Sequence, residues 1–214
     1  AVQTSSNFNI KSTITSNSNL VSGAFASVNN KSSLSTKNEF SDILNGFVID
    51  GVYTKTVDVS SPEGVLYNTN YNLYEVSTGL YYELGEFSIN PYLSTFAKNY
   101  GIPGGFVGAH PNGVDIEMQR NTMGFNSEYH THGAVIDKLK LDYERSFYDH
   151  KEYENSGLIG AQFRFVSNSV RFELEQHQGS LLKSGYIGLQ LTKKDNELGG
   201  FVFIPNNQYT ISNS

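Results

Sequence analysis

The chain has no cysteine and no tryptophan, and it has only two methionines among its 214 residues. The lack of cysteine excludes disulfide bonds and thiolate metal sites. Hydrophobic residues make up 38% of the chain, below the share of about 45–50% that is usual in globular domains. No apolar run approaches the roughly 20 residues of a transmembrane helix, so the sequence predicts no helical membrane span.

Basic residues are also in the minority, with 15 Lys and Arg against 21 Asp and Glu. Proteins that bind nucleic acid present a basic patch or stripe, so we expect no nucleic-acid partner. A G-x-S-x-G elbow, a phosphate loop and a dinucleotide fingerprint are all missing from the sequence. Ser, His and Asp side chains on separate strands could still meet in space, but the sequence predicts no enzyme and no cofactor.

Aromatic residues and glycine are abundant, with 14 Tyr, 14 Phe and 20 Gly. Apolar and polar residues alternate along nearly the whole chain, and helical periodicity is almost absent. A membrane β-barrel has this composition, because only every second residue of a strand faces lipid. The sequence therefore predicts an all-β, antiparallel up-and-down transmembrane β-barrel, with residues 1–214 as a single β-barrel region of about 9–11 strands. A soluble sheet is the alternative.

The alternating segments place the strands along the chain. They predict strands over residues 8–14, 20–28, 43–59, 71–84, 87–98, 114–131, 136–148, 158–176 and 186–193, with another beginning at Thr210. The polar residues 29–41 are interpreted as a loop or a weakly paired edge. Residues 149–157 are interpreted as a polar link, and the chain beyond Asp195 as loop-like.

Three local features refine this prediction. Gly85-Glu86 joins two alternating runs, which indicates a tight hairpin, and residues 60–64 have the composition of a turn. Pro91 cannot donate a hydrogen bond to a ladder, so we expect an edge or a bulge there. The apolar positions change parity at residues 166–169, which predicts a bulge or a turn.

Ordered motifs surround the longest interruption, which begins at Tyr100. The sequence reads YGIPG at residues 100–104 and GVDIEMQR at residues 113–120, and then LKLDY at residues 139–143. With Thr54-Lys55-Thr56, Glu128-Tyr129 and residues 157–165, this order resembles the barrel portion of TonB-dependent outer-membrane receptors. The resemblance is to the zinc- and siderophore-receptor-like group, and it covers most of residues 40–195.

The resemblance implies a location in the outer membrane of a Gram-negative bacterium, with outer-membrane lipid around the wall. It implies uptake of a metal, a metal chelate or a similar small solute, driven by a TonB complex through a plug domain. No plug-like segment and no aromatic-terminated final strand are recognised, so the chain is expected to be a barrel fragment. A complete small porin of about 10–12 strands and a soluble secreted β-adhesin are the alternative functions.

Three external loops are expected to form the binding surface: residues 98–114, 149–157 and 194–208. Four residues in and after the first loop are the candidate ligand-binding residues: His110, Asp115, Glu117 and Arg120. One histidine and one nearby carboxylate are too few for a closed metal site, so any metal stays unknown. Glu117 and Arg120 have opposite parity, which places them on opposite faces of a strand.

Two further clusters have alternative interpretations. His130 and His132 share a face and form a possible metal pair, but a solvated strand end beside a turn is favoured. A run of acidic residues follows, and it is interpreted as an exposed hairpin tip that is kept soluble by charge, or as a cation-recruiting patch. Its members are Asp142, Glu144, Asp149, Glu152 and Glu154.

Overall fold

The computed structural model describes residues 16–42, 44–105, 113–133, 135–154, 157–177, 185–200 and 208–213. The secondary-structure elements in these residues are twelve β-strands. They are β1 (Ser16–Ala26), β2 (Lys31–Ser41), β3 (Asn45–Lys55), β4 (Val59–Ser61), β5 (Gly64–Leu66), β6 (Tyr71–Leu84), β7 (Phe87–Ile102), β8 (Val114–His130), β9 (Ile136–Tyr153), β10 (Ile159–Gln176), β11 (Tyr186–Gly200) and β12 (Gln208–Asn213). Among these residues, no helix is long and apolar enough to cross a membrane.

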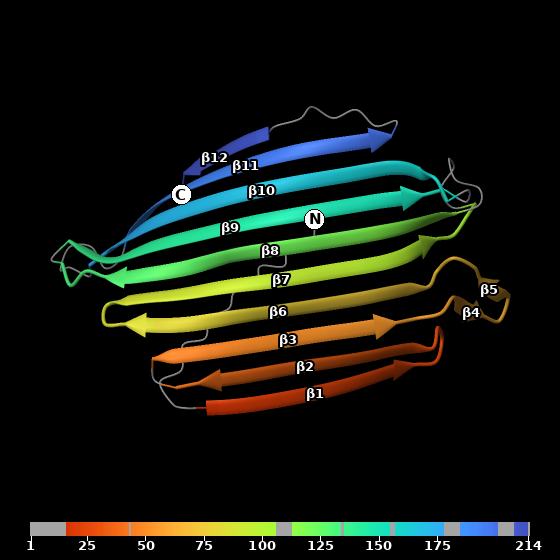
Figure 1. Cartoon of the computed structure of the whole chain (residues 1–214), viewed down its shortest axis with the longest axis horizontal. Helices are drawn as coiled ribbons and strands as arrows, with labels where there is room; N and C mark the ends of the chain where they lie inside the picture. The colour runs from red at the N-terminus through yellow and green to blue at the C-terminus, as the bar shows by residue number, and fades with distance from the viewer. Residues whose placement is uncertain are drawn as a thin grey trace.

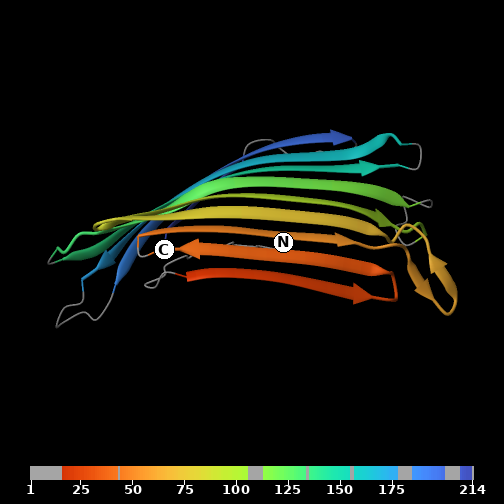
Figure 2. The ribbon, with the colours of Figure 1, turned by 60° about the horizontal axis from the view of Figure 1, so that its bottom comes forward.

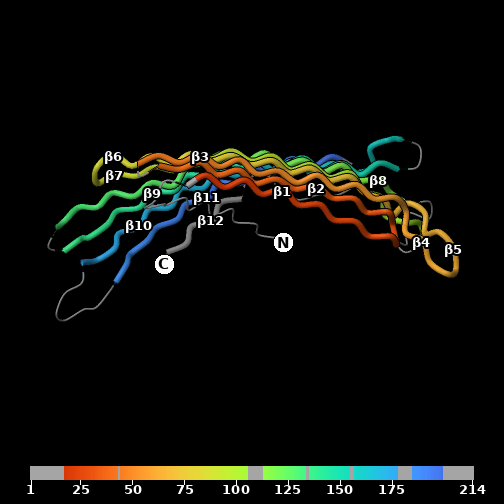
Figure 3. Tube along the Cα trace, turned by 90° about the horizontal axis from the view of Figure 1, so that it is seen from below, coloured from red at the N-terminus to blue at the C-terminus, as the bar shows by residue number. Residues whose placement is uncertain are grey.

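Ten of the strands form one antiparallel sheet in the order β1-β2-β3-β6-β7-β8-β9-β10-β11-β12 (Figure 1). Each of these strands pairs with the next one along the chain, and only the short β4–β5 hairpin stands apart from the sheet. The predicted all-β, antiparallel, up-and-down sheet is therefore confirmed. The sheet is a single twisted layer that curves along its length (Figures 2 and 3). It is not closed, because β1 and β12 lie at opposite edges.

The two faces of the sheet differ in composition, and the strand register defines them. The apolar face carries the odd-numbered residues of β8 and their cross-strand partners. Large hydrophobic side chains are exposed on it: Ile49, Tyr53, Tyr74, Val76, Tyr82, Leu84, Leu93, Met123, Tyr129, Leu141, Val170, Phe172, Ile187, Leu189 and Leu191. The opposite side, the polar face, carries Ser, Thr, Asn and charged side chains at most positions.

Most of the buried side chains lie on the polar face. They include Val48, Thr54, Ser77, Tyr81, Asn90, Val114, Ile116, Ala161 and Asn196. The sheet is a single layer, so side chains become buried mainly where neighbours on the same face crowd together. Side chains converge on the concave side of a curved sheet, so this distribution indicates that the polar face is the concave one.

The prediction for residues 29–41 is wrong, because residues 31–41 form β2, a regular strand that pairs with β1 and β3 over its length. Its small polar side chains alternate with Leu34 and Phe40, which suits a strand with one polar face. The predicted strand 43–59 is also wrong, since β3 ends at Lys55 and β4 begins at Val59. The turn predicted at residues 60–64 is confirmed, and it joins β4 to β5. The predicted strand 8–14 lies outside the described residues.

Pro91 lies in β7, a central strand, so the prediction of an edge or a bulge is wrong. The pairs Gly79–Tyr92 and Tyr82–Ile89 have the same offset, and the two pairs between them are missing from the β6 side. On the β8 side Pro91 still pairs with Phe125. The missing N–H therefore interrupts one ladder locally and leaves the register of the sheet unchanged.

The apolar parity change in β10 does not mark a bulge. Residues 166–169 pair in continuous register with both β9 and β11, and the irregularities of the β9–β10 ladder lie near Ile159 and Gln176. Phe163 and Phe165 lie on the polar face, whereas Val170 and Phe172 lie on the apolar face. The parity changes because the hydrophobic residues of β10 lie on the polar face at one end of the strand and on the apolar face at the other.

Three strands run past their predicted ends. β7 continues to Ile102, β9 to Tyr153 and β11 to Gly200, so the polar link at 149–157 and the loop-like chain directly after Asp195 are wrong. The external loops predicted at 98–114, 149–157 and 194–208 are correspondingly shorter where they are described. The acidic run is not a hairpin tip either, because four of its five members lie within β9: Asp142, Glu144, Asp149 and Glu152.

The tight hairpin at Gly85-Glu86 is confirmed, and Gly85 adopts a φ of 62°, which a glycine allows at no steric cost. Its Glu86 carboxylate contacts the next turn, since Glu86 Oε2 lies 2.7 Å from Nε2 of His132. His132 is thus a solvated residue in the turn after β8. The part of the chain that the structure describes contains no group of three His, Cys, Asp or Glu residues that could hold a metal ion.

The hydrogen bond with Glu86, and then its negative charge, raise the pKa of His132 above the ordinary value of 6.5. The pair therefore stabilises the fold fully below the unfolded-state pKa, and this contribution is lost as pH rises through the raised folded-state pKa. We expect an NMR titration to show His132 deprotonating above pH 6.5 and Glu86→Gln to move the midpoint down. Glu63→Gln in the β4–β5 turn is the matched control. An unchanged midpoint in Glu86→Gln would contradict the contact.

Candidate functional site

Aromatic and charged side chains gather on the polar face near the end of the sheet that carries the β4–β5 hairpin. We call this group the inner cluster. Its members are Tyr71, Phe96, Lys98, Tyr100, Arg120, Tyr148, His150, Glu152, Phe163 and Phe165. The ladders place them in three adjacent rows across β6–β10, so residues that are up to about 90 positions apart in sequence become neighbours.

Both cations of the inner cluster lie over aromatic rings. Lys98 Nζ is 4.6 Å from the ring centroid of Tyr100 and 5.1 Å from that of Tyr71. Arg120 Cζ is 5.7 Å from the ring centroid of Phe96. Attraction between a cation and the negative face of a ring holds each charge in place.

A hydrogen-bonded chain runs along β9 beside these cations. The Tyr148 hydroxyl is 3.0 Å from Nδ1 of His150, and Nε2 of His150 is 3.2 Å from Oε1 of Glu152. The ring of Tyr148 stacks on Phe165 at 5.5 Å between centroids, and His150 meets Phe163 edge-on at 5.4 Å. The two phenylalanines of β10 therefore fix the orientation of the polar groups on β9.

This arrangement suits an organic ligand that has both flat and negatively charged parts. Aromatic rings offer stacking surfaces, and the ammonium and guanidinium groups offer hydrogen-bond donors beside them. On β9, the imidazole of His150 can donate or accept a hydrogen bond, and the carboxylate of Glu152 can accept one. The inner cluster can thus bind an organic anion or a chelate through its organic part.

Asn68 connects the β4–β5 hairpin to the strands that frame the inner cluster. Its side-chain amide donates to the carbonyls of Ile102 and Val114, at 3.1 and 3.2 Å. These residues end β7 and begin β8. A Cβ on Gly101 would collide with Asn68, and a Cβ on Gly113 would lie 2.6 Å from the carbonyl of Ile102. Gly101 of the YGIPG motif and Gly113 of the GVDIEMQR motif are therefore needed for this junction.

The four predicted ligand-binding residues do not form one site. Arg120 belongs to the inner cluster, whereas Asp115 and Glu117 lie on the opposite face. The carboxylate of Glu117 accepts a hydrogen bond of 2.9 Å from the Tyr153 hydroxyl. His110 lies outside the described residues. The opposite parity of Glu117 and Arg120 in the sequence thus corresponds to opposite faces of β8.

Sequence analysis missed most of the inner cluster. Lys98 was predicted at the boundary between the strand 87–98 and the loop 98–114, and His150 fell within the predicted polar link. One signal was present, because Phe163 and Phe165 break the apolar parity of β10. This pair marks the hydrophobic part of the cluster.

Comparison with known proteins gives no match, since neither a protein-family model nor a curated protein matches the chain.

Proposed function

We propose that the sheet is part of the wall of a transmembrane β-barrel in the outer membrane of a Gram-negative bacterium. The barrel belongs to a transporter of the TonB-dependent receptor kind, which takes up a metal chelate or a similar small organic solute. The observation that carries this proposal is the apolar band on one face and the way in which its border crosses the strands.

The border is the first charged or amide side chain beyond the apolar segment of each strand, toward the β4–β5 end of the sheet. From β3 to β11 the border residues are Lys55, Asn72, Asn99, Asn121, Arg145, Asn168 and Lys193. Those of β3, β6 and β7 lie in one cross-strand row, which continues to Gly199 on β11. The border residue of β11, Lys193, lies six positions before Gly199. Relative to the row of Asn99, the border is therefore shifted by six residues away from the β4–β5 end, and this shift occurs between β7 and β9.

An inclined border is expected of strands that cross a membrane at an angle. The border is level from β3 to β7 and again from β9 to β11, and the whole shift of six residues falls across β8. Six residues rise about 20 Å along a strand, and six inter-strand steps span about 29 Å, so the mean inclination over the seven strands is about 35°. Strands of outer-membrane barrels are tilted by about 35–45°. On β1 and β2 this face mixes the amides of Asn17, Asn19 and Asn38 with exposed apolar side chains, so the band loses its continuous apolar segment toward this edge of the sheet.

The proposal also has a requirement at the edges of the sheet. Unpaired strand edges do not occur in the hydrocarbon region, where no water can satisfy their N–H and C=O groups. In the membrane β1 and β12 must therefore be paired, either with each other or with further strands. The polar face then lines the lumen, and the inner cluster lies on the path of the solute. The TonB complex would act through a plug, which the described sheet does not include.

Cysteine scanning tests the proposal, because the chain has no cysteine of its own. Each introduced cysteine, in protein reconstituted in vesicles, carries a nitroxide. We expect the nitroxides on the apolar face to be relaxed more by oxygen than by a water-soluble nickel chelate. Those on the polar face should show the reverse. The matched neighbours are Leu93 and Ser94, Met123 and Thr122, and Leu189 and Gln190. Preference for the nickel chelate at all six positions would refute a membrane wall and indicate a soluble sheet.

A further inference from the structure

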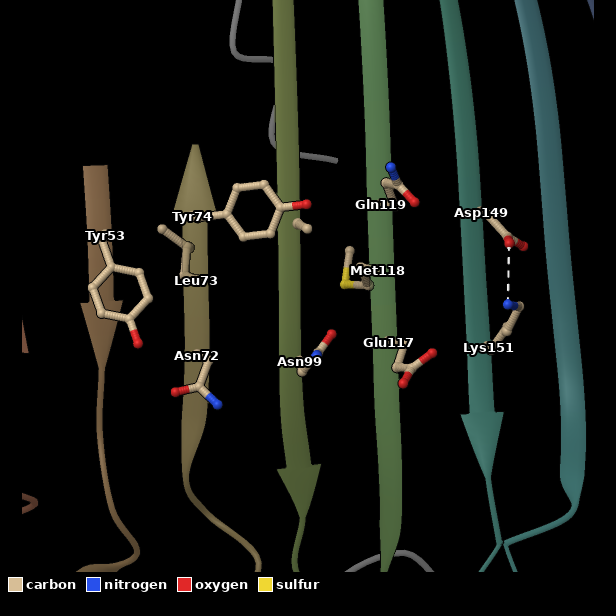
Figure 4. A pocket seen from close by; sticks show the side chains of 11 residues that line it. Tyr53, Asn72, Leu73, Tyr74, Asn99, Glu117, Met118, Gln119, Asp149 and Lys151 are labelled. Carbon is tan, nitrogen blue, oxygen red and sulfur yellow. Dashed lines mark ion pairs between the residues drawn. The ribbon is translucent and has the colours of Figure 1, made fainter. Parts of the chain in front are cut away.

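A depression lies on the apolar face just where the apolar band ends (Figure 4). Tyr53 and Tyr74 border it on one side, and Asn99, Glu117 and Gln119 border it on the other. Its volume is about 270 Å³, which corresponds to roughly nine water molecules. We call it the outer depression.

The floor of the outer depression is formed by a small residue between large ones. Ala97 pairs with Tyr74 on β6 and with Gln119 on β8, so these three residues form one row. In Figure 4 the Tyr74 ring reaches from β6 toward β7. The methyl group of Ala97 leaves room beside that ring.

The polar groups around the floor are exposed or already held in place. The amides of Asn72, Asn99 and Gln119 are exposed. Tyr153 fixes the Glu117 carboxylate, as described above. The Asp149 carboxylate accepts a hydrogen bond of 2.8 Å from Gln162 Nε2. It also lies 3.6 Å from Lys151 Nζ, the pair that Figure 4 marks with a dashed line.

This combination of groups has the chemistry of a saccharide site. The C–H face of a sugar stacks on an aromatic ring, and its hydroxyls pair with amides and carboxylates. The two carboxylates of the lining, on Glu117 and Asp149, are balanced by Lys151 and by Arg164, whose Nε lies 3.5 Å from Oδ1 of Asp149. The site therefore has no excess positive charge to hold a phosphate. The ligand that fits is an uncharged sugar.

The position of the outer depression determines where this sugar comes from. It lies at the border of the apolar band, which on the proposed function is the level of the lipid headgroups. A headgroup anchored in the same leaflet is presented at high effective concentration. We propose, resting on the proposed function, that the outer depression binds the saccharide headgroup of a glycolipid in the surrounding leaflet.

Filling the floor tests this proposal without removing a polar group. The protein is reconstituted with digalactosyl diacylglycerol and phosphatidylcholine and released into native mass spectrometry. We expect the retained glycolipid to fall at least about tenfold in Ala97→Leu, a loss of about 1.4 kcal/mol. Two controls should retain the glycolipid. Ala97→Ser keeps the depression open, and Asn121→Leu changes a residue of β8 on the same face of the sheet, outside the lining.

Three results decide the proposal. Equal retention of the glycolipid by the parent protein and Ala97→Leu would overturn it. Retention of free digalactose as strong as that of the glycolipid would overturn the lipid source. The nitroxide scan is repeated on the same samples. If the nitroxides on the apolar face are exposed to lipid but the glycolipid is not selectively retained, only the saccharide site is refuted. If those nitroxides are exposed to water, the membrane wall itself is refuted.

Discussion

Replacement of Leu93 by arginine is expected to lower the free energy of unfolding of the membrane-embedded protein by about 2–4 kcal/mol, the cost of a cation at mid-depth on a lipid-facing strand. Leu93 is 57% exposed, and it lies on β7 midway between Phe87 and the border residue Asn99. No neighbouring carboxylate shares its row on β6 or β8, where its partners are Thr78 and Met123.

The matched control is Ser94→Arg, which places the same cation on the polar face one position along the strand. We expect this variant to change the unfolding free energy by no more than about 0.5 kcal/mol, as is usual for solvated positions. Urea unfolding in lipid vesicles, followed by tyrosine fluorescence, measures both variants, since the chain has 14 Tyr and no Trp. Equal losses in the two variants would show that lipid does not cover the apolar face.

Gly124→Ala is expected to reduce the free energy of unfolding by about 1–3 kcal/mol, as other overpacked positions do. An added Cβ would collide with the carbonyl oxygen of Tyr143 and would lie 2.7 Å from the hydroxyl oxygen of Tyr92. The backbone carbonyl cannot yield without disturbing the β8–β9 ladder. The Tyr92 hydroxyl is held as well, because it donates to Oε2 of Glu144 at 3.0 Å.

Gly51→Ala provides the comparison for Gly124→Ala, since Gly51 also lies in the interior of a central strand. Its added Cβ would make only ordinary contacts, the shortest being 3.6 Å to the carbonyl oxygen of Glu75. We expect Gly51→Ala to be neutral or to stabilise by up to about 1 kcal/mol, because alanine loses less backbone entropy on folding. The difference between the two variants, measured in one urea series, is the quantity to test. A difference near zero would mean that Gly124 tolerates a side chain.

Sequence alternation predicted the middle of the sheet well. The bounds of β6 agree with the prediction, and those of β8 agree to within one residue, because apolar and polar residues alternate along most of each strand, although in β8 the apolar residues change faces between Met118 and Met123. Alternation failed at β2, where serine and charged residues fill one face and only Leu34 and Phe40 remain as a signal. It also failed at the ends of β9 and β11, where both faces are polar and the strands continue because their neighbours supply hydrogen bonds.

The inner cluster could not be predicted from spacing along the chain. Its contacts join Lys98 to Tyr71 and Tyr148 to Phe165, and each pair meets only because the register of two ladders places it there. Parity alone assigned Arg120 correctly to the face opposite Glu117. The partners on the other strands depend on the pairing offset, and a shift of one residue would turn a whole strand to the other face.

The Asn68 junction has a mechanical consequence. One side-chain amide connects the β4–β5 hairpin to carbonyls that are 34 and 46 positions further along the chain. A ligand or a neighbouring molecule that pulls on the hairpin therefore also pulls on the ends of β7 and β8, beside the inner cluster.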